Sequence, residues 1–142
     1  MPSVILKVFL DSNIWFSAFY GSVNCQKLIK AHTNEKIKAV VSRQVLEESI
    51  RNIKEKIPEI LSVFQTYLIN YPPLLISDPE ILNSRIRGLV NKYDQPIFIS
   101  AMMGKVDYFV TGNIRHFQVK KLEKLTGIKI LTPKQAVDLL RL

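Results

Sequence analysis

Short apolar runs alternate with amphipathic stretches along most of the chain. Residues 4–10 are nearly all apolar, as in a strand buried on both faces, and 37–41, 108–110 and 128–131 are typical of shorter strands. Helical spacing and capping residues predict helices over 14–20, 24–33, 42–57, 58–70 and 79–92, and others starting at 94 and at 132. Strands that alternate with helices predict a three-layer α/β/α fold around a central, mainly parallel sheet of four to five strands.

Polar residues follow two of the predicted strands. Asp11, Ser12 and Asn13 come directly after the first strand, and the run 111–113 (Thr-Gly-Asn) follows the strand at 108–110. In sheets of this kind, ligands bind beyond the carboxyl ends of the strands. We therefore expect a site there, which an acidic residue at the start of another helix, such as Asp94, can join.

Each acidic candidate has two interpretations. Asp11 and Asp94 are either helix caps, which accept hydrogen bonds from free N–H groups, or ligands of a metal ion. Glu47 and Glu48 lie on the helix at 42–57, where most glutamates are simply solvated. Glu48 lies away from the apolar stripe of that helix, so periodicity does not favour a buried position. Asn13 is expected to bond to Asp11 or to support the same site.

The remaining polar candidates are equally open. The turn that contains Thr111 and Asn113 either joins a strand to the next element or supports the site. His116 is interpreted as an exposed polar residue, and His32 suits the negative end of a helix dipole. Cys25 has no cysteine or histidine neighbour at zinc spacing, so an inert thiol is expected.

Composition narrows the class of protein. The formal net charge of +8 favours a polyanionic partner, although a basic surface also serves solubility alone. The single cysteine suits a reducing cytoplasm, the start of the chain lacks the pattern of a signal peptide, and no apolar run has the length of a membrane span. Cytoplasmic location is therefore expected. Phosphate-binding glycine loops and the GxSxG and HExxH motifs are absent from the sequence, which offers acids rather than a nucleophile triad.

Five motifs follow one another in order. Asp-Ser-Asn (11–13) ends a strand, Val-Leu-Glu-Glu (45–48) opens a helix, and an acid begins the run 94–101. Residues 107–113 form a strand and a Thr-Gly-Asn turn, and 127–133 form a last strand and helix start. This series resembles the PIN-domain ribonuclease family, most closely the branch of toxin components of toxin–antitoxin pairs. The resemblance covers nearly the whole chain and implies a single PIN-like domain over residues 1–142.

The resemblance implies a metal-dependent endoribonuclease. Its acids would be Asp11, Glu48 and Asp94, which would bind Mg²⁺ or Mn²⁺, a choice that all-oxygen ligands also favour over zinc. Asn113 would complete the catalytic set, with Thr111 as a supporting residue. Hydrolysis would leave 5′-phosphate and 3′-hydroxyl ends. An antitoxin protein and a second copy of the chain, in a homodimer, are the implied protein partners.

One position departs from the family pattern. Many members carry a fourth acid where this chain has Asn113, so the site has one negative charge fewer. That difference leaves open a catalytically weak or inactive PIN-like module that binds RNA or protein. Asp107 precedes a whole strand, so we expect it at the opposite edge of the sheet.

Contacts with RNA, expected to be single-stranded, are assigned to basic and aromatic side chains. Tyr93 or Phe117 is expected to stack on a base. The basic candidates are Arg43, Arg51, Lys54, Arg85, Arg87, Arg115, Lys120 and Lys121.

Overall fold

A computed structural model describes residues 4–81 and 83–142. The strands are β1 (Leu6–Leu10), β2 (Ile37–Ser42), β3 (Leu74–Ile76), β4 (Tyr108–Val110) and β5 (Lys129–Leu131). The α-helices are α1 (Ser12–Tyr20), α2 (Val23–Thr33), α3 (Arg43–Lys56), α4 (Leu61–Asn70), α5 (Gln95–Met103), α6 (Val119–Thr126) and α7 (Pro133–Leu140). Short 3₁₀ turns are η1 (Pro58–Ile60), η2 (Ser84–Ile86), η3 (Lys92–Asp94) and η4 (Ile114–His116). Within this part of the chain, no helix is both long enough and apolar enough to cross a membrane.

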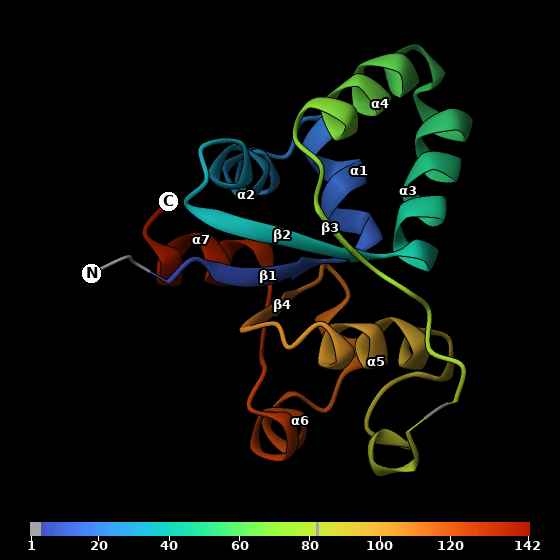
Figure 1. The fold of residues 1–142 in the computed structure, drawn as a ribbon, viewed down its shortest axis with the longest axis vertical. Coiled ribbons are helices and arrows are strands. Elements are labelled where there is room, and N and C mark those ends of the chain that lie inside the picture. The colour runs from blue at the N-terminus through green and yellow to red at the C-terminus, as the bar shows by residue number, and fades with distance from the viewer. Residues whose placement is uncertain (1–3, 82) are drawn as a thin grey trace.

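The five strands form one sheet in the order β3-β2-β1-β4-β5, and every neighbouring pair is parallel. The chain moves outward from β1 through β2 to β3, then returns to the other side of β1 for β4 and β5 (Figure 1). The strand order therefore reverses between β1 and β4, and ligands of such sheets usually bind outside the carboxyl ends of the strands at this position. Asp11 and Thr111 follow these two strands directly.

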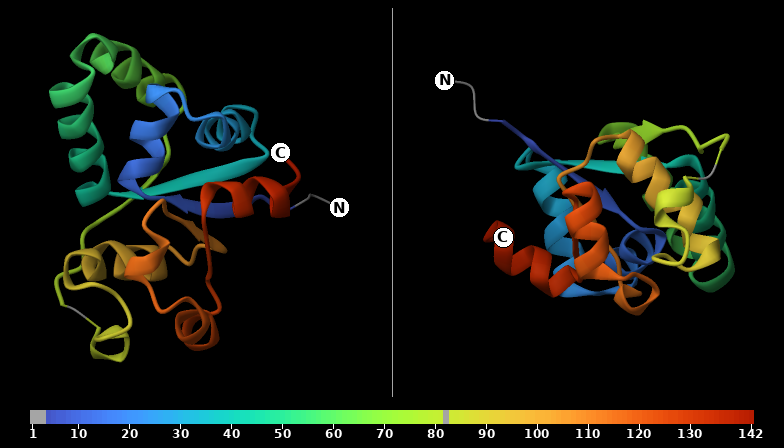
Figure 2. Two further views of the ribbon diagram at one scale, coloured as in Figure 1. Left: turned by 180° about the vertical axis from the view of Figure 1, so that it is seen from behind. Right: turned by 90° about the horizontal axis from the view of Figure 1, so that it is seen from below.

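Helices cover both faces of the sheet, as expected. Helices α1 to α4 lie on one side, with α7 against α2, and α5 and α6 lie on the other (Figures 1 and 2). The core contains the buried residues of β1 and β4, with Phe9 and Phe109 stacked at a ring-centroid distance of 5.1 Å. These observations confirm the predicted three-layer α/β/α fold.

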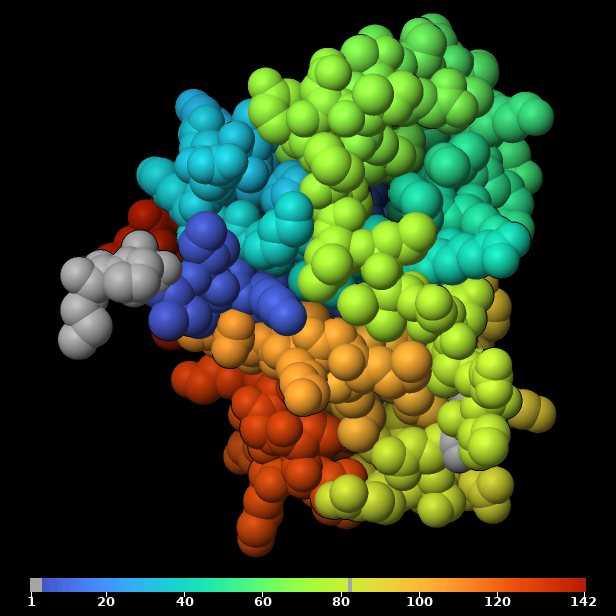
Figure 3. Space-filling model, in the orientation of Figure 1, coloured from blue at the N-terminus to red at the C-terminus, as the bar shows by residue number. Residues whose placement is uncertain are grey.

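Two segments differ from the sequence-based expectation. The strand β3 was not predicted; it lies directly after two prolines, at the edge of the sheet, and crosses the face of the molecule seen in Figure 3. The helix predicted over 79–92 is wrong for the described residues of that range, and position 82 lies outside them. Asn83 caps the short turn η2, and Gly88 has φ +80°, which ends helical geometry. Its internal backbone hydrogen bonds form only short turns, and further ones join Asn91 to the His116 carbonyl and Gln118 to the Leu89 carbonyl.

The His32 side chain links two backbone groups by hydrogen bonds and does not act as a charged helix cap. It is buried, and its Nδ1 accepts the amide hydrogen of Ala39 in β2 at 3.1 Å. Nε2 must then carry the proton, which it donates to the carbonyl of Tyr71 at 3.0 Å. Burial, followed by the nearby Lys38 charge, lowers the pKa of His32. The side chain is therefore neutral in the folded protein and does not act on the helix dipole.

We expect protonation of the His32 side chain to destabilise the folded protein in acid. The folded pKa of His32 lies below its ordinary value of 6.5, so its contribution to stability is full above that pH and is lost as the pH falls below it. The urea midpoint of the wild-type protein should therefore fall, relative to that of His32→Gln, between neutral pH and about pH 5. The control His116→Gln changes a partly exposed histidine. An equal pH dependence in wild type and His32→Gln would contradict the assignment.

Candidate active site

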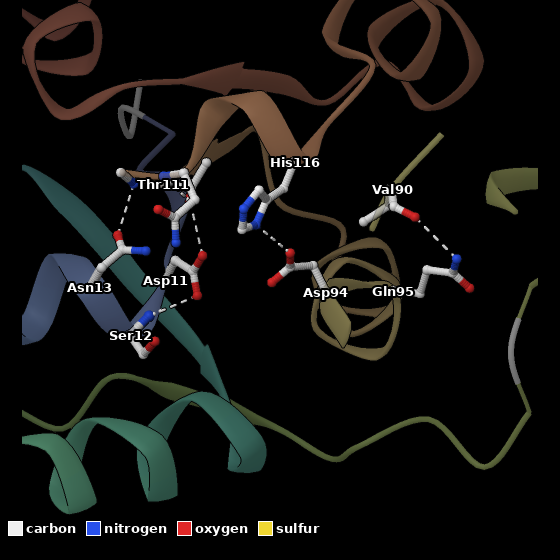
Figure 4. Close-up of polar contacts among 10 residues, drawn as sticks. Asp11, Ser12, Asn13, Val90, Asp94, Gln95, Thr111 and His116 are labelled. Atoms are coloured by element: carbon white, nitrogen blue, oxygen red, sulfur yellow. Dashed lines mark hydrogen bonds and ion pairs between the residues drawn. The ribbon is translucent and has the colours of Figure 1, made fainter. Parts of the chain in front are cut away.

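Asp11 lies at the point where the strand order reverses. Its side chain is buried, and its Oδ1 accepts the amide hydrogen of Ser12 at 2.8 Å, so the residue does cap α1. Oδ2 accepts a hydrogen bond from the hydroxyl of Thr111 at 2.9 Å (Figure 4). Burial raises the pKa of Asp11 to about 6, against the lowering effect of these two hydrogen bonds. Capping a helix does not require a fully buried carboxylate. The burial of Asp11 is therefore compatible with a second role at the site.

The turn after β4 is fixed to α1 by two side chains. Thr111 is fully buried, and its Oγ1 also accepts the amide hydrogen of Asn113 at 3.1 Å. Asn13 accepts the amide hydrogen of Gly112 at 2.8 Å, so it supports the turn and not the Asp11 carboxylate directly. A Cβ on Gly112 would approach the Asn13 Oδ1 to 3.1 Å, which explains a glycine at this position.

Asp94 enters from the other face of the sheet. It precedes α5, but its side chain makes no capping hydrogen bond. Its Oδ2 instead accepts a hydrogen bond from Nδ1 of His116 at 2.8 Å (Figure 4). The main chain strengthens this link, because Asn91 donates its amide hydrogen to the His116 carbonyl at 3.0 Å. His116, expected to be merely exposed, therefore positions the Asp94 carboxylate.

Glu48 faces the same region from α3. The buried stripe of this helix runs through Val45, Ser49 and Ile53, which places Glu48 beside it and half-buried. Burial raises the pKa of Glu48, although the nearby Tyr93 and Ser12 hydroxyls lower it. Its Oε2 atom is buried without a hydrogen-bond partner among the described residues. Such an atom is costly unless a cation or water satisfies it.

The three acids lie within electrostatic reach of one another. The charges of Asp94 and Glu48 both raise the pKa of Asp11, and Asp94 also raises that of Glu48. They do not form a closed cage: in residues 4–81 and 83–142, no three Asp, Glu, His or Cys side chains are grouped closely enough to hold an ion. Their role as joint ligands stays a prediction.

The donor set fits a hard divalent cation. Asp11, Glu48 and Asp94 offer carboxylate oxygens, the ligands that Mg²⁺ and Mn²⁺ prefer. The unpartnered Oε2 of Glu48 and the mutual repulsion of the acids are features that a cation would relieve. The site therefore combines buried negative charge with an unsatisfied oxygen.

Other candidates lie outside this group. Glu47 is exposed and pairs with Arg43 at 3.0 Å, in line with the solvated interpretation. Asp107 accepts the amide hydrogen of Lys7 at 2.8 Å at the opposite edge of the sheet, as expected. Asn113 is exposed.

The expected RNA-binding side chains divide into two groups. Phe117 is buried and packs against Phe98 and Phe109, so the prediction that it stacks on a base is wrong. Tyr93 is 59% exposed beside Glu48, and its stacking role stays a prediction. All of the basic candidates are exposed: Arg43, Arg51, Lys54, Arg85, Arg87, Arg115, Lys120 and Lys121.

The chain was compared with known proteins. No protein-family model matches the sequence, and no curated protein matches it. Among solved structures, a chain of VapBC2 from Rickettsia felis, which was crystallised with a DNA fragment from the promoter, is similar in fold. The match has a TM-score of 0.59 at 16% sequence identity and covers 89% of this chain and 98% of that chain. The chain thus has the PIN-like fold that its motifs indicate.

Proposed function

We propose that the protein is a Mg²⁺- or Mn²⁺-dependent endoribonuclease. The observation that supports this most strongly is the electrostatic coupling of Asp11, at the reversal of strand order, with Glu48 and Asp94. Each of the first two carboxylates has its pKa raised by burial and by neighbouring acids. Acids with perturbed pKa values that gather in one crevice are typical of catalytic sites. The basic surface offers a complementary charge for the RNA backbone.

Each residue of the site has a role in the proposed reaction. Asp11, Glu48 and Asp94 would hold the ion, Thr111 orients Asp11, and His116 orients Asp94. A bound Mg²⁺ or Mn²⁺ ion would supply an activated water and offset negative charge on the attacked phosphate. Water would add to phosphorus and the bond to the 3′ oxygen would break, with a proton passing to that oxygen. The products would be 5′-phosphate and 3′-hydroxyl ends.

The biological setting is also a proposal. The motif resemblance and the similarity to a VapBC2 chain support a toxin that is paired with an antitoxin protein and acts in the cytoplasm. A homodimer is proposed from the same resemblance. Co-expression with the product of the adjacent gene, followed by purification through a tag on one partner, would test the pairing.

We expect Asp94→Asn to lower Mn²⁺-dependent cleavage of single-stranded RNA at least about a hundredfold, because the site loses a negative charge that holds the cation. Cleavage should be measured with purified protein, with and without EDTA. Asp107→Asn, a change at the opposite edge of the sheet, is the matched control. Full activity in Asp94→Asn, or equal losses in both variants, would contradict the proposal.

A binding module without catalysis is the second candidate. Two observations favour it: Asn113 is neutral where many family members carry an acid, and the acids do not enclose an ion directly in the described residues. RNA affinity that falls steeply with salt, without turnover in Mg²⁺ or Mn²⁺, would support this function instead.

A further inference from the structure

A stacked aromatic pair lies on α1, the helix that Asp11 caps. The rings of Phe16 and Tyr20 are 5.3 Å apart between centroids, with an angle of 21° between their planes. Lys56 of α3 places its Nζ 5.2 Å from the centre of the Phe16 ring. Tyr20 remains 66% exposed, although aromatic side chains usually bury most of their surface.

The aromatic pair is aligned with the candidate active site along α1. Ser12, Phe16 and Tyr20 are spaced by four residues and so lie on one face of α1. The first of them lies near Glu48 and the second contacts Lys56, so α1 and α3 face each other along this line. Eight residues of helix span about 12 Å from Ser12 to Tyr20.

We propose that Tyr20 is a stacking platform for a base of single-stranded RNA whose backbone reaches Asp11, Glu48 and Asp94. Phe16 supports the inner face of the tyrosine ring, and Lys56 lies close enough to contact a phosphate. This inference rests on the proposed function, because it assumes that RNA binds at the candidate active site. The charges favour a polyanion over a protein partner: Lys56 lies at the pair, and the charge of Arg51, on the same helix, acts on Glu48.

Stacking on an exposed ring predicts a specific pattern of affinities. Tyr20→Ala should weaken the binding of a fluorescein-labelled oligouridylate at least about fivefold, whereas Tyr20→Phe, which keeps the ring, should bind within about twofold of wild type. Fluorescence anisotropy in EDTA measures the dissociation constant without cleavage. A protein that binds in this pattern but never cuts RNA would sustain the inference while the nuclease proposal failed.

The matched control is Tyr71→Ala. Tyr71 is also partly exposed, at 43%, and its ring centroid lies 5.3 Å from that of Tyr67 in a tilted pair, but it follows α4 and lies beside His32. Unchanged affinity in Tyr20→Ala, or an equal loss in Tyr71→Ala, would overturn the proposal. A shift in sedimentation of Tyr20→Ala without any change in RNA affinity would also overturn it, and would indicate an interface with a second copy of the chain.

Discussion

Replacing Asp11 with asparagine is expected to lower RNA cleavage at least about a hundredfold and yet to stabilise the folded protein at neutral pH. The activity falls because the site loses a carboxylate. The stability rises because burial, together with the charges of Asp94 and Glu48, penalises a charged Asp11 and raises its pKa to about 6. A shift of this size corresponds to roughly 3 kcal/mol. Asparagine keeps the shape but loses part of the hydrogen bonding, so a gain of about 1–2 kcal/mol is expected.

The stability gain expected for Asp11→Asn depends on pH. The folded pKa of Asp11 lies above its ordinary value of 3.8, so the native state binds the proton more tightly than the unfolded chain does. The wild-type protein therefore loses stability as pH rises from about 4 to about 6, and Asp11→Asn does not. The stability gain of the variant should be full at neutral pH and vanish near pH 4, in urea unfolding with EDTA present.

Asp138→Asn is the matched control, because Asp138 is an exposed acid on α7. It should change neither the cleavage rate nor the free energy of unfolding by a measurable amount. A destabilised Asp11→Asn at neutral pH would show that the buried charge is already compensated in the absence of a metal ion.

The largest loss of stability is expected from Phe109→Ala. Phe109 is fully buried in β4, where its ring packs within about 5 Å of those of Phe9, Phe98 and Phe117. Truncation would leave a cavity between β1 and α5 and should lower the free energy of unfolding by about 3–5 kcal/mol. That is a large part of the roughly 5–15 kcal/mol that stabilises a typical domain. Urea denaturation, with midpoint and slope both recorded, measures the loss.

The aromatic cluster around Phe109 also supports the candidate active site. Phe109 lies two residues before Thr111, which holds the Asp11 carboxylate, so activity should fall with stability in Phe109→Ala. Tyr20→Ala removes an exposed ring and should cost less than about 1 kcal/mol. Similar losses of stability in the two variants would contradict the view that the β1–β4 aromatic cluster is the centre of the core.

The sequence predicted those elements of the fold whose pattern of apolar and polar residues was unambiguous. The run 4–10 is apolar apart from Lys7, and its last three residues, 8–10, are fully buried because both faces of β1 are covered there. The three residues of β3 offered no such pattern: Leu75 is 55% exposed at the edge of the sheet. The segment 83–92 has residues compatible with a helix, but its backbone is held by η4, a contact that local propensity does not encode.

The site was predictable only in part. Asp11 and Thr111 could be placed together because the carboxyl ends of parallel strands meet at one edge. The bond between His116 and Asp94 joins residues that are 22 positions apart, and no periodicity marks it. The signal that could have suggested it is chemical, since a histidine is a natural donor to a buried carboxylate. Periodicity did not identify Glu48, which lies next to the buried stripe of α3, whereas the family resemblance did.

Anomalous diffraction from crystals soaked in Mn²⁺ tests the central claim most directly. We expect a single strong peak bounded by the carboxylates of Asp11 and Asp94, with the Oε2 atom of Glu48 turned toward it. Well-ordered side chains with no peak between them at saturating Mn²⁺, or an ion bound elsewhere on the protein, would contradict a shared metal site.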